Sequence, residues 1–316
     1  MSRIHEALKR AEQERAASQT AQGSDRQAEH GSASSVIETA PPPTGILPNL
    51  GLPHGNVAHS ESAKISAPLK FETLWSKCSR RDWKPDPNLV VFENSNPFFP
   101  GAEQFRTLRS RLYRMREGQP LQSILISSAI PAEGKTMVST NLAYALVRQQ
   151  GCHVLLIDAD LRSPRIHTLL GAPAAPGLAD YLQNTATEFE VTQRASEDGL
   201  CFIPAGNHVT HPSELISSDR MRQFLDRVRP AFDWIIIDSP PALPVADASV
   251  LGGLVDGVLF VVRANATPSE VSQKACKELR DAHILGVVLN NAEESAAYNS
   301  YYSGGAYGAP PVATKK

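Results

Sequence analysis

A loop with the residue types of a phosphate-binding site lies at positions 129–136, where the chain reads AIPAEGKT. Its last three residues match the pattern G-x-x-x-x-G-K-[ST], and alanine replaces the first glycine. Gly134 lets the backbone pass close to a phosphate, Lys135 can reach the β- and γ-phosphates, and Thr136 can bind Mg²⁺. The tripeptide alone is common, but here an apolar segment precedes it and a helical pattern follows. The residues expected to contact a nucleotide in this loop are Ala129, Pro131, Ala132, Glu133, Gly134, Lys135, Thr136 and Met137.

Three aspartates stand at the ends of two other apolar segments. Asp158 and Asp160 are two residues apart, so both side chains leave a strand on the same side. Asp238 ends the apolar run WIIID, a usual position for the second metal-side carboxylate of phosphate-loop proteins. Such carboxylates can hold Mg²⁺ directly or through water, or accept a proton from an attacking hydroxyl, although one of them could instead cap a helix. We expect Lys135 and the three aspartates to be catalytic and Thr136 with the aspartates to bind the metal, with the division of roles left open.

Alternating apolar strands and helices position these residues. Strands are expected at 122–128, 153–158, 200–204, 234–238, 257–263 and 285–290. Such near-continuous apolar strands indicate a sheet covered on both faces, in which ligands bind beyond the carboxyl ends of the strands. Helices are expected at 134–149 and at 268–282, the second opening with a capping box from Thr267 to Glu270. The fold class is therefore α/β, a doubly wound, mostly parallel sheet in a three-layer sandwich of the P-loop NTPase type, with an altered phosphate loop.

Composition limits the class of protein. The chain has 316 residues, a formal net charge of -2, and 41% hydrophobic residues. This balance gives no support to a general nucleic-acid binder, which would carry a basic excess. No apolar run approaches the ~18 residues of a membrane span, and the charges near the N-terminus argue against a signal peptide. The four cysteines form no C-x-x-C pair, so we expect reduced thiols and a cytoplasmic protein.

The composition also divides the chain into four parts. Residues 1–15 carry apolar side chains at helical spacing, which predicts an amphipathic helix that packs on its own domain or docks to a partner. Residues 16–69 are rich in Ser, Ala, Gly, Gln and Pro and are expected to form a disordered linker. A phosphate-loop domain is expected over 70–294 and a flexible, tyrosine-rich tail over 295–316.

The three motifs, with their flanks, resemble those of the bacterial tyrosine kinases (BY-kinases) of capsule and exopolysaccharide export. The phosphate loop of that family also departs from the usual first glycine. Its D-x-D element is similar to IDADLR at 157–162, and its D-[ST]-P-P element is similar to DSPP at 238–241. The resemblance covers roughly the last two thirds of the chain, from about Glu103 to Tyr307. It implies an ATP- and Mg²⁺-dependent protein tyrosine autokinase of the stand-alone cytoplasmic type, with a kinase domain over 70–294.

Two further features match this family. Glu103, Arg106 and Arg109 form its E-x-x-R-x-x-R element, which mediates subunit contact in those kinases. On a helix the three charges share one face, over an arc of about 120° and a rise of about 9 Å, and the alternative is an ordinary solvated face. The second feature is a tail rich in tyrosine, either by chance or as an autophosphorylation substrate. The expected phosphoacceptors are Tyr298, Tyr301, Tyr302 and Tyr307.

The resemblance also implies partners. We expect a homo-oligomer, as a ring in which tails are phosphorylated in trans, and a separate membrane co-polymerase that activates the kinase. The N-terminal helix and linker could help to recruit this partner, which would hold the protein at the inner membrane. Asn290, at the end of the last expected strand, either reads adenine through its amide, as in related phosphate-loop proteins, or is a turn residue.

Two other functions remain open. A dimeric switch ATPase shares the fold and the aspartate motifs, but it carries an extra lysine where this chain has Ile130. A nucleotide-binding scaffold could gate export without phosphorylating anything. Either alternative would leave the tail tyrosines unmodified.

Overall fold

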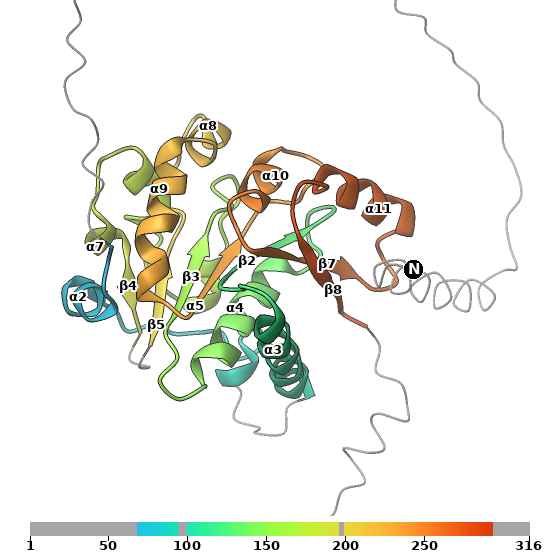
Figure 1. The fold of residues 1–316 in the computed structure, drawn as a ribbon, viewed down its shortest axis with the longest axis horizontal. Helices are drawn as coiled ribbons and strands as arrows, with labels where there is room; N and C mark the ends of the chain where they lie inside the picture. The colour runs from blue at the N-terminus through green and yellow to red at the C-terminus, as the bar shows by residue number, and fades with distance from the viewer. Residues whose placement is uncertain (1–67, 94–99, 196–198, 293–316) are drawn as a thin grey trace, which may run out of the picture.

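An eight-stranded sheet forms the centre of the molecule (Figure 1). The structure is a computed structural model that describes residues 68–93, 100–195 and 199–292. The strand order is β1-β4-β5-β3-β6-β2-β7-β8. Among the described pairs β4 and β5 are antiparallel, and the other neighbours are parallel. The strands are β1 (Ser79–Arg80), β2 (Ser123–Ser128), β3 (Val154–Asp158), β4 (Gln193–Arg194), β5 (Leu200–Ile203), β6 (Trp234–Asp238), β7 (Gly257–Arg263) and β8 (Ile284–Asn290).

Successive residues of the inner strands pack into two separate apolar cores. In β2, Ile124 and Ile126 belong to one core and Leu125 to the other, and β3, β6 and β7 alternate in the same way. Because side chains alternate between the two faces of a strand, a strand that is apolar throughout must be covered on both sides. The near-continuous apolar runs of the sequence therefore become the middle layer of a three-layer sandwich.

Helices supply the two outer layers (Figure 1). Leu112, Leu142 and Ile166 place three helices in the core that contains Ile124, and Phe224 and Leu251 belong to the core on the opposite face. The first layer contains η1 (Val91–Glu93), α3 (Pro100–Gly118), α4 (Lys135–Val147) and α5 (Ile166–Leu170). The second contains α2 (Phe71–Lys77), α6 (Leu178–Leu182), α7 (Glu188–Val191), α8 (Pro212–Ile216), α9 (Asp219–Val228), η2 (Arg229–Ala231), α10 (Asp247–Gly252) and α11 (Ser269–Glu278).

The α/β class, the mostly parallel sheet and all six expected strands are confirmed, with boundaries that shift by at most one residue. The sequence patterns did not indicate β1 and β4, which have two residues each. A strand of two residues is too short to show periodicity, and its pairing depends on contacts that are distant in sequence.

The start of α11 differs from the expected capping box. Pro268 is the N-cap residue, the helix begins at Ser269, and no side chain caps it. The hydroxyl of Thr267 instead donates to Glu133 Oε1 at 2.7 Å. A buried carboxylate must be paired, and Glu133 takes the hydroxyl that the local pattern assigns to the helix.

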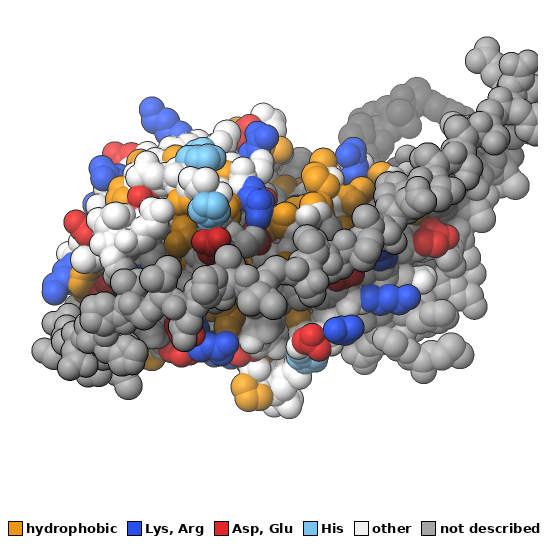
Figure 2. Space-filling model, turned by 90° about the horizontal axis from the view of Figure 1, so that it is seen from above, with side chains coloured by type: hydrophobic (Ala, Val, Ile, Leu, Met, Phe, Trp, Pro, Cys, Tyr) orange, Lys and Arg blue, Asp and Glu red, His pale blue; other side chains and the backbone are white. Residues whose placement is uncertain are grey.

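Other features concern the surface and the ends of the chain. Within the described ranges, no helix is long and apolar enough to cross a bilayer. The cysteines are free thiols, and Cys78, Cys152 and Cys201 are buried. On the face in Figure 2, Lys and Arg side chains are interspersed with Asp and Glu. The expected N-terminal helix, nearly all of the linker and the tail tyrosines lie outside the described residues.

Candidate functional site

The phosphate-loop residues form the connection between β2 and α4. Ala129 is buried at its base, while Pro131 and Ala132 are exposed at its tip. Gly134 has a φ of 95° and is the N-cap of α4, so the N-cap position has no side chain to bond the first amides of the helix. These amides, with the positive end of the helix dipole, are free to bind an anion.

Lys135 lies at the first position of α4, and only 7% of it is exposed. Its ammonium group makes no hydrogen bond to any residue in the part of the chain that the structure describes. A buried ammonium needs an anionic partner. The residue therefore fits a site that receives phosphate oxygens, as the sequence predicts.

Asp238 meets the phosphate loop from the neighbouring strand, because β6 pairs with β2. Its Oδ1 lies 2.9 Å from the Ser139 hydroxyl of α4. Complete burial raises the pKa of Asp238 to about 6, against the opposing effects of a hydrogen bond from Thr136 and the charge of Lys135. Lys135, Thr136 and Asp238 are therefore brought together as expected.

Asp158 is the register partner of Asp238 on β3 and is also fully buried. Its carboxylate accepts hydrogen bonds from the backbone amides of Arg165 and Ile166 at 3.1 Å and of Asp160 at 3.3 Å. Burial, followed by the charge of Asp238, raises its pKa well above the usual range. Asp158 thus holds the turn after β3, and its role as a proton acceptor stays a prediction.

Asp160 completes the acidic side of the site. It is 9% exposed, and its Oδ1 accepts a hydrogen bond from the Ser163 amide at 3.0 Å. Among the described residues, no three His, Cys, Asp or Glu side chains are grouped closely enough to hold a metal ion. Mg²⁺ usually takes one or two carboxylates together with phosphate oxygens and water. The buried Asp238 beside Thr136 fits that donor set, so the site fits a magnesium–nucleotide complex better than a free metal ion.

Asn290 reaches the phosphate loop from the end of β8. Its Nδ2 donates to the backbone oxygen of Glu133 at 2.9 Å. A Cβ on Gly134 would lie 1.9 Å from this Nδ2, so the close contact requires glycine. Adenine reading stays a prediction, but the side chain supports the loop rather than only a turn.

Sequence reasoning did not identify a second group of residues at the same edge. Arg162 Nε donates to Asp247 Oδ2 at 3.1 Å, and its Nη2 donates to the Ser213 hydroxyl at 2.7 Å. Asp247 is 2% exposed and also accepts a hydrogen bond from Ser213. These contacts join the connections after β3, β5 and β6. Both charged residues stand near a recognised motif, Arg162 after the D-x-D element and Asp247 after DSPP. No sequence pattern indicates that the two side chains bind each other.

The expected interface residues lie on α3, as predicted for a helix. Glu103 and Arg106 form an ion pair at 2.9 Å with 41% of each side chain exposed. Arg109 instead donates to the Ala145 carbonyl of α4 at 2.8 Å. Their role in subunit contact stays a prediction, and Arg109 already has a partner within its own chain.

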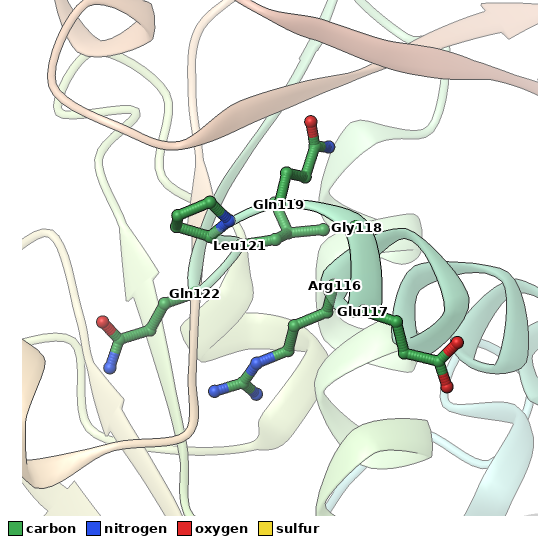
Figure 3. A pocket seen from close by; sticks show the side chains of 7 residues that line it. Arg116, Glu117, Gly118, Gln119, Leu121 and Gln122 are labelled. Carbon is green, nitrogen blue, oxygen red and sulfur yellow. The ribbon is translucent and has the colours of Figure 1, made fainter.

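A hollow of about 560 Å³ lies elsewhere, between the end of α3 and the start of β2 (Figure 3). Arg116 Nη1 donates to the Asp233 carbonyl at 3.1 Å, and its guanidinium lies 4.9 Å from the Trp234 ring centroid. In Figure 3 the Glu117 side chain points away from Arg116. This hollow is at the amino end of β2, opposite the phosphate loop, and is not the nucleotide site.

Several known proteins and one protein-family model are similar in sequence to this chain. A protein-family model described as an AAA domain matches residues 123–267. The tyrosine-protein kinase YwqD of Bacillus subtilis (strain 168) is 34% identical over 207 residues, which are 65% of this chain and 87% of YwqD. The succinoglycan biosynthesis transport protein ExoP of Rhizobium meliloti (strain 1021) is 35% identical over 61% of this chain, which spans only 25% of ExoP.

A solved structure agrees with the sequence relatives. The kinase domain of the Escherichia coli tyrosine kinase ETK superposes with a TM-score of 0.63 at 33% identity, and the match covers 73% of this chain and 89% of that domain. The residues that match the family model, 123–267, include the phosphate loop and the three aspartates. The chain therefore belongs to the family of bacterial tyrosine kinases.

Proposed function

We propose that the protein is an ATP-dependent tyrosine autokinase that regulates the polymerisation and export of a capsular polysaccharide or exopolysaccharide. The observation that supports this most strongly is the meeting of Lys135, Thr136 and Asp238 at the carboxyl ends of two neighbouring strands. The names of YwqD and ETK support the kinase activity, and the name of ExoP supports the link to polysaccharide.

The mechanism is transfer of the γ-phosphoryl group of ATP to a tyrosine oxygen. The loop amides and Lys135 bind the β- and γ-phosphates and stabilise the charge that develops on them. Thr136, Asp160 and Asp238 would hold Mg²⁺, directly or through water, and the bound ion would neutralise charge on the phosphate oxygens. The tyrosine oxygen bonds to the γ-phosphorus as the bond to ADP breaks. Asp158 would orient the tyrosine hydroxyl or accept its proton.

Assembly and tail phosphorylation would regulate this activity. Under the proposal, Glu103, Arg106 and Arg109 contribute to contacts within a ring, and the tail tyrosines enter a neighbouring site. Each phosphate adds roughly -1.5 to -2 charge to the tail. That charge would expel the tail and loosen the ring.

A separate membrane co-polymerase would activate the kinase and hold it at the cytoplasmic side of the inner membrane. The amphipathic pattern of residues 1–15 supports recruitment through the N-terminal segment. Deletion of residues 1–68 should then abolish recruitment by the membrane partner.

The alternative function is a nucleotide switch or scaffold that gates export without kinase activity. It would use the same phosphate loop and aspartates, and it would hydrolyse ATP or only bind it. The tail separates the two functions, because a switch or scaffold leaves Tyr298, Tyr301, Tyr302 and Tyr307 unmodified.

The test compares the full-length chain with its Lys135→Met variant. With Mg-ATP, mass spectrometry should find phosphotyrosine in the wild-type tail, and Lys135→Met should lose it together with most of its nucleotide affinity. Lys274→Met, at an exposed position on α11, is the matched control and should behave as wild type. Equal phosphorylation of wild type and Lys135→Met would exclude the catalytic role of Lys135. Nucleotide binding with an unmodified tail, even beside a candidate activator, would favour the scaffold.

A further inference from the structure

The Glu133 side chain makes hydrogen bonds both within the phosphate loop and outside it. It is 1% exposed, although it lies in a loop whose tip is open to solvent. Its Oε2 accepts a hydrogen bond from the Ile130 amide, within the same loop, at 2.8 Å. Its Oε1 accepts the Thr267 hydroxyl at 2.7 Å and the Arg263 amide at 3.4 Å. The carboxylate therefore ties the loop to the connection between β7 and α11.

A second contact fixes the same residue through its backbone. The Glu133 carbonyl accepts the Asn290 side-chain amide at 2.9 Å. Glu133, Thr267 and Asn290 are here called the loop anchor. They come from the phosphate loop and from two elements more than a hundred residues later, namely the entrance to α11 and the end of β8.

The loop has a conformation that needs such support. Ala132 has a φ of 65° and Gly134 a φ of 95°, both in the left-handed region. A residue with a side chain is strained there, at a cost on the order of 1 kcal/mol or more. Strained loop backbones persist only when surrounding contacts determine them.

The use of Thr267 supports a dedicated role. It lies just before Pro268, the N-cap of α11. The sequence pattern assigns its hydroxyl to capping that helix, and a lost cap typically costs about 1 kcal/mol. The hydroxyl binds Glu133 instead, and α11 has no side-chain cap. The Thr267 hydroxyl thus stabilises the phosphate loop rather than the start of its own helix.

We propose that Glu133 is a positioning residue that, through Thr267 and Asn290, holds the phosphate loop in the shape that binds a nucleotide. This inference rests on the proposed nucleotide-binding function. The Glu133 carboxylate accepts hydrogen bonds from Ile130, Thr267 and Arg263, so its charge is stabilised by donors of the protein before a triphosphate arrives. Without these contacts the loop would sample other conformations, and nucleotide binding would have to order it.

The test measures Mg-ADP affinity by calorimetry and the midpoint of thermal unfolding for full-length variants. Glu133→Ala should weaken binding by about tenfold or more. Thr267→Val removes one hydroxyl with little change of shape and should weaken binding by several-fold. Glu133→Gln keeps one acceptor oxygen and should recover part of the affinity. The double variant of Glu133→Ala and Thr267→Val should bind no more weakly than Glu133→Ala alone, because both act through one contact.

Glu188→Ala is the matched control. Glu188 is a buried glutamate on α7, paired with Arg227 and distant from the loop. It should lower the unfolding midpoint and leave the Mg-ADP affinity unchanged. If Glu133→Ala and Thr267→Val also change only the midpoint, the loop anchor is merely structural and the inference is wrong. Failure of the wild-type chain to bind Mg-ADP would instead overturn the proposed function.

Discussion

Asp158 and Asp238 are buried side by side on adjacent strands, and the pKa of each is raised. In the described part of the chain, the charge of Lys135 offsets part of this effect at Asp238. Burial disfavours the charged form of each carboxyl, and the two charges repel one another. Such an arrangement is unfavourable for the free protein at neutral pH. The Mg²⁺ ion of a bound magnesium–nucleotide complex would supply positive charge beside the two carboxylates. The site therefore costs stability in the free protein and favours binding.

The first prediction concerns Asp238→Asn in the absence of nucleotide. The folded carboxyl keeps its proton up to about pH 6, whereas the ordinary pKa of an aspartate is 3.8. The folded state therefore binds more protons between these values, and the stability of the wild type falls as pH rises through this window. Asp238→Asn removes this loss, and we expect it to raise the free energy of unfolding at pH 7.5 by up to about 3 kcal/mol. Urea unfolding at pH 5 and 7.5 measures the change.

Two further measurements check that interpretation. Mg-ADP should raise the unfolding midpoint of the wild type and leave that of Asp238→Asn unchanged. Asp256→Asn is the control, and it should change the free energy of unfolding in the opposite direction. Burial acts to raise the pKa of Asp256, but hydrogen bonds from Ser123 and Gln122 outweigh it and the pKa is lowered, so its removal should destabilise the protein at pH 7.5. Asp238→Asn unfolding more easily than wild type at pH 7.5 would contradict the prediction.

Single residues also show what sequence patterns can reveal. Lys135 and Asp238 were predictable because their residue type, spacing and place at a strand end together indicate phosphate and metal chemistry. The carboxylate contacts of Glu133 were not, because its partner Thr267 is more than a hundred residues away and the local pattern around Thr267 favours a helix cap. The contact between Arg162 and Asp247 was not predictable either, because the two residues are 85 positions apart in the sequence.

At the scale of elements, the charged residues that share one face of α3 have different partners. One arginine bonds to the neighbouring helix, and the other pairs with a glutamate of α3 itself. Arg109 donates to the carbonyl of Ala145, one of the last carbonyls of α4 and without a partner within that helix. The positive charge also lies at the negative end of the α4 dipole. Arg106 and Glu103 pair with one another and remain 41% exposed. Helical spacing predicted the shared face, but only tertiary packing shows that one arginine serves its own chain.

The second prediction separates these two arginines. Arg109→Ala should lower the free energy of unfolding by about 1 kcal/mol, because it leaves a helix carbonyl unpaired. Arg106→Ala should change it by less than about 0.5 kcal/mol, since exposed ion pairs contribute little. Under the proposed ring, Arg106→Ala should shift the oligomer toward monomer in analytical ultracentrifugation. Equal unfolding curves for the two variants would contradict the assignment, and unchanged sedimentation of Arg106→Ala would remove that residue from the interface.

At the scale of the whole molecule, parallel strands bring the nucleotide site and the base of the tail to one edge. The loop after β2, the aspartates of β3 and β6, and Asn290 at the end of β8 all lie at carboxyl ends. This arrangement was predictable, because alternating apolar strands and helices favour a doubly wound sheet with its ligands at that edge. The two short strands at the other side of the sheet were not, since their pairing carries no local signal.

The last prediction concerns which site modifies the tail. Tyr298 is the eighth residue after Asn290, and eight extended residues span at most about 29 Å. Chain length alone therefore allows a tyrosine to enter its own site or that of a neighbour. A ring favours the neighbour, because its subunits present sites to one another's tails. Mixing an active chain truncated after residue 294 with the full-length Lys135→Met variant separates the two routes, since only the inactive chain has the tail.

We expect phosphotyrosine on the tail of Lys135→Met in this mixture, measured by mass spectrometry, and its yield should rise with the concentration of the truncated chain. The full-length wild type, assayed under the same conditions, shows that the preparation is active. Adding Arg106→Ala to the truncated chain and to Lys135→Met should reduce the transfer if α3 forms the contact between subunits. An unmodified tail in the mixture, beside a phosphorylated wild type, would instead mean that each chain phosphorylates itself, and regulation through assembly would then have to act on the site rather than on the delivery of the tail.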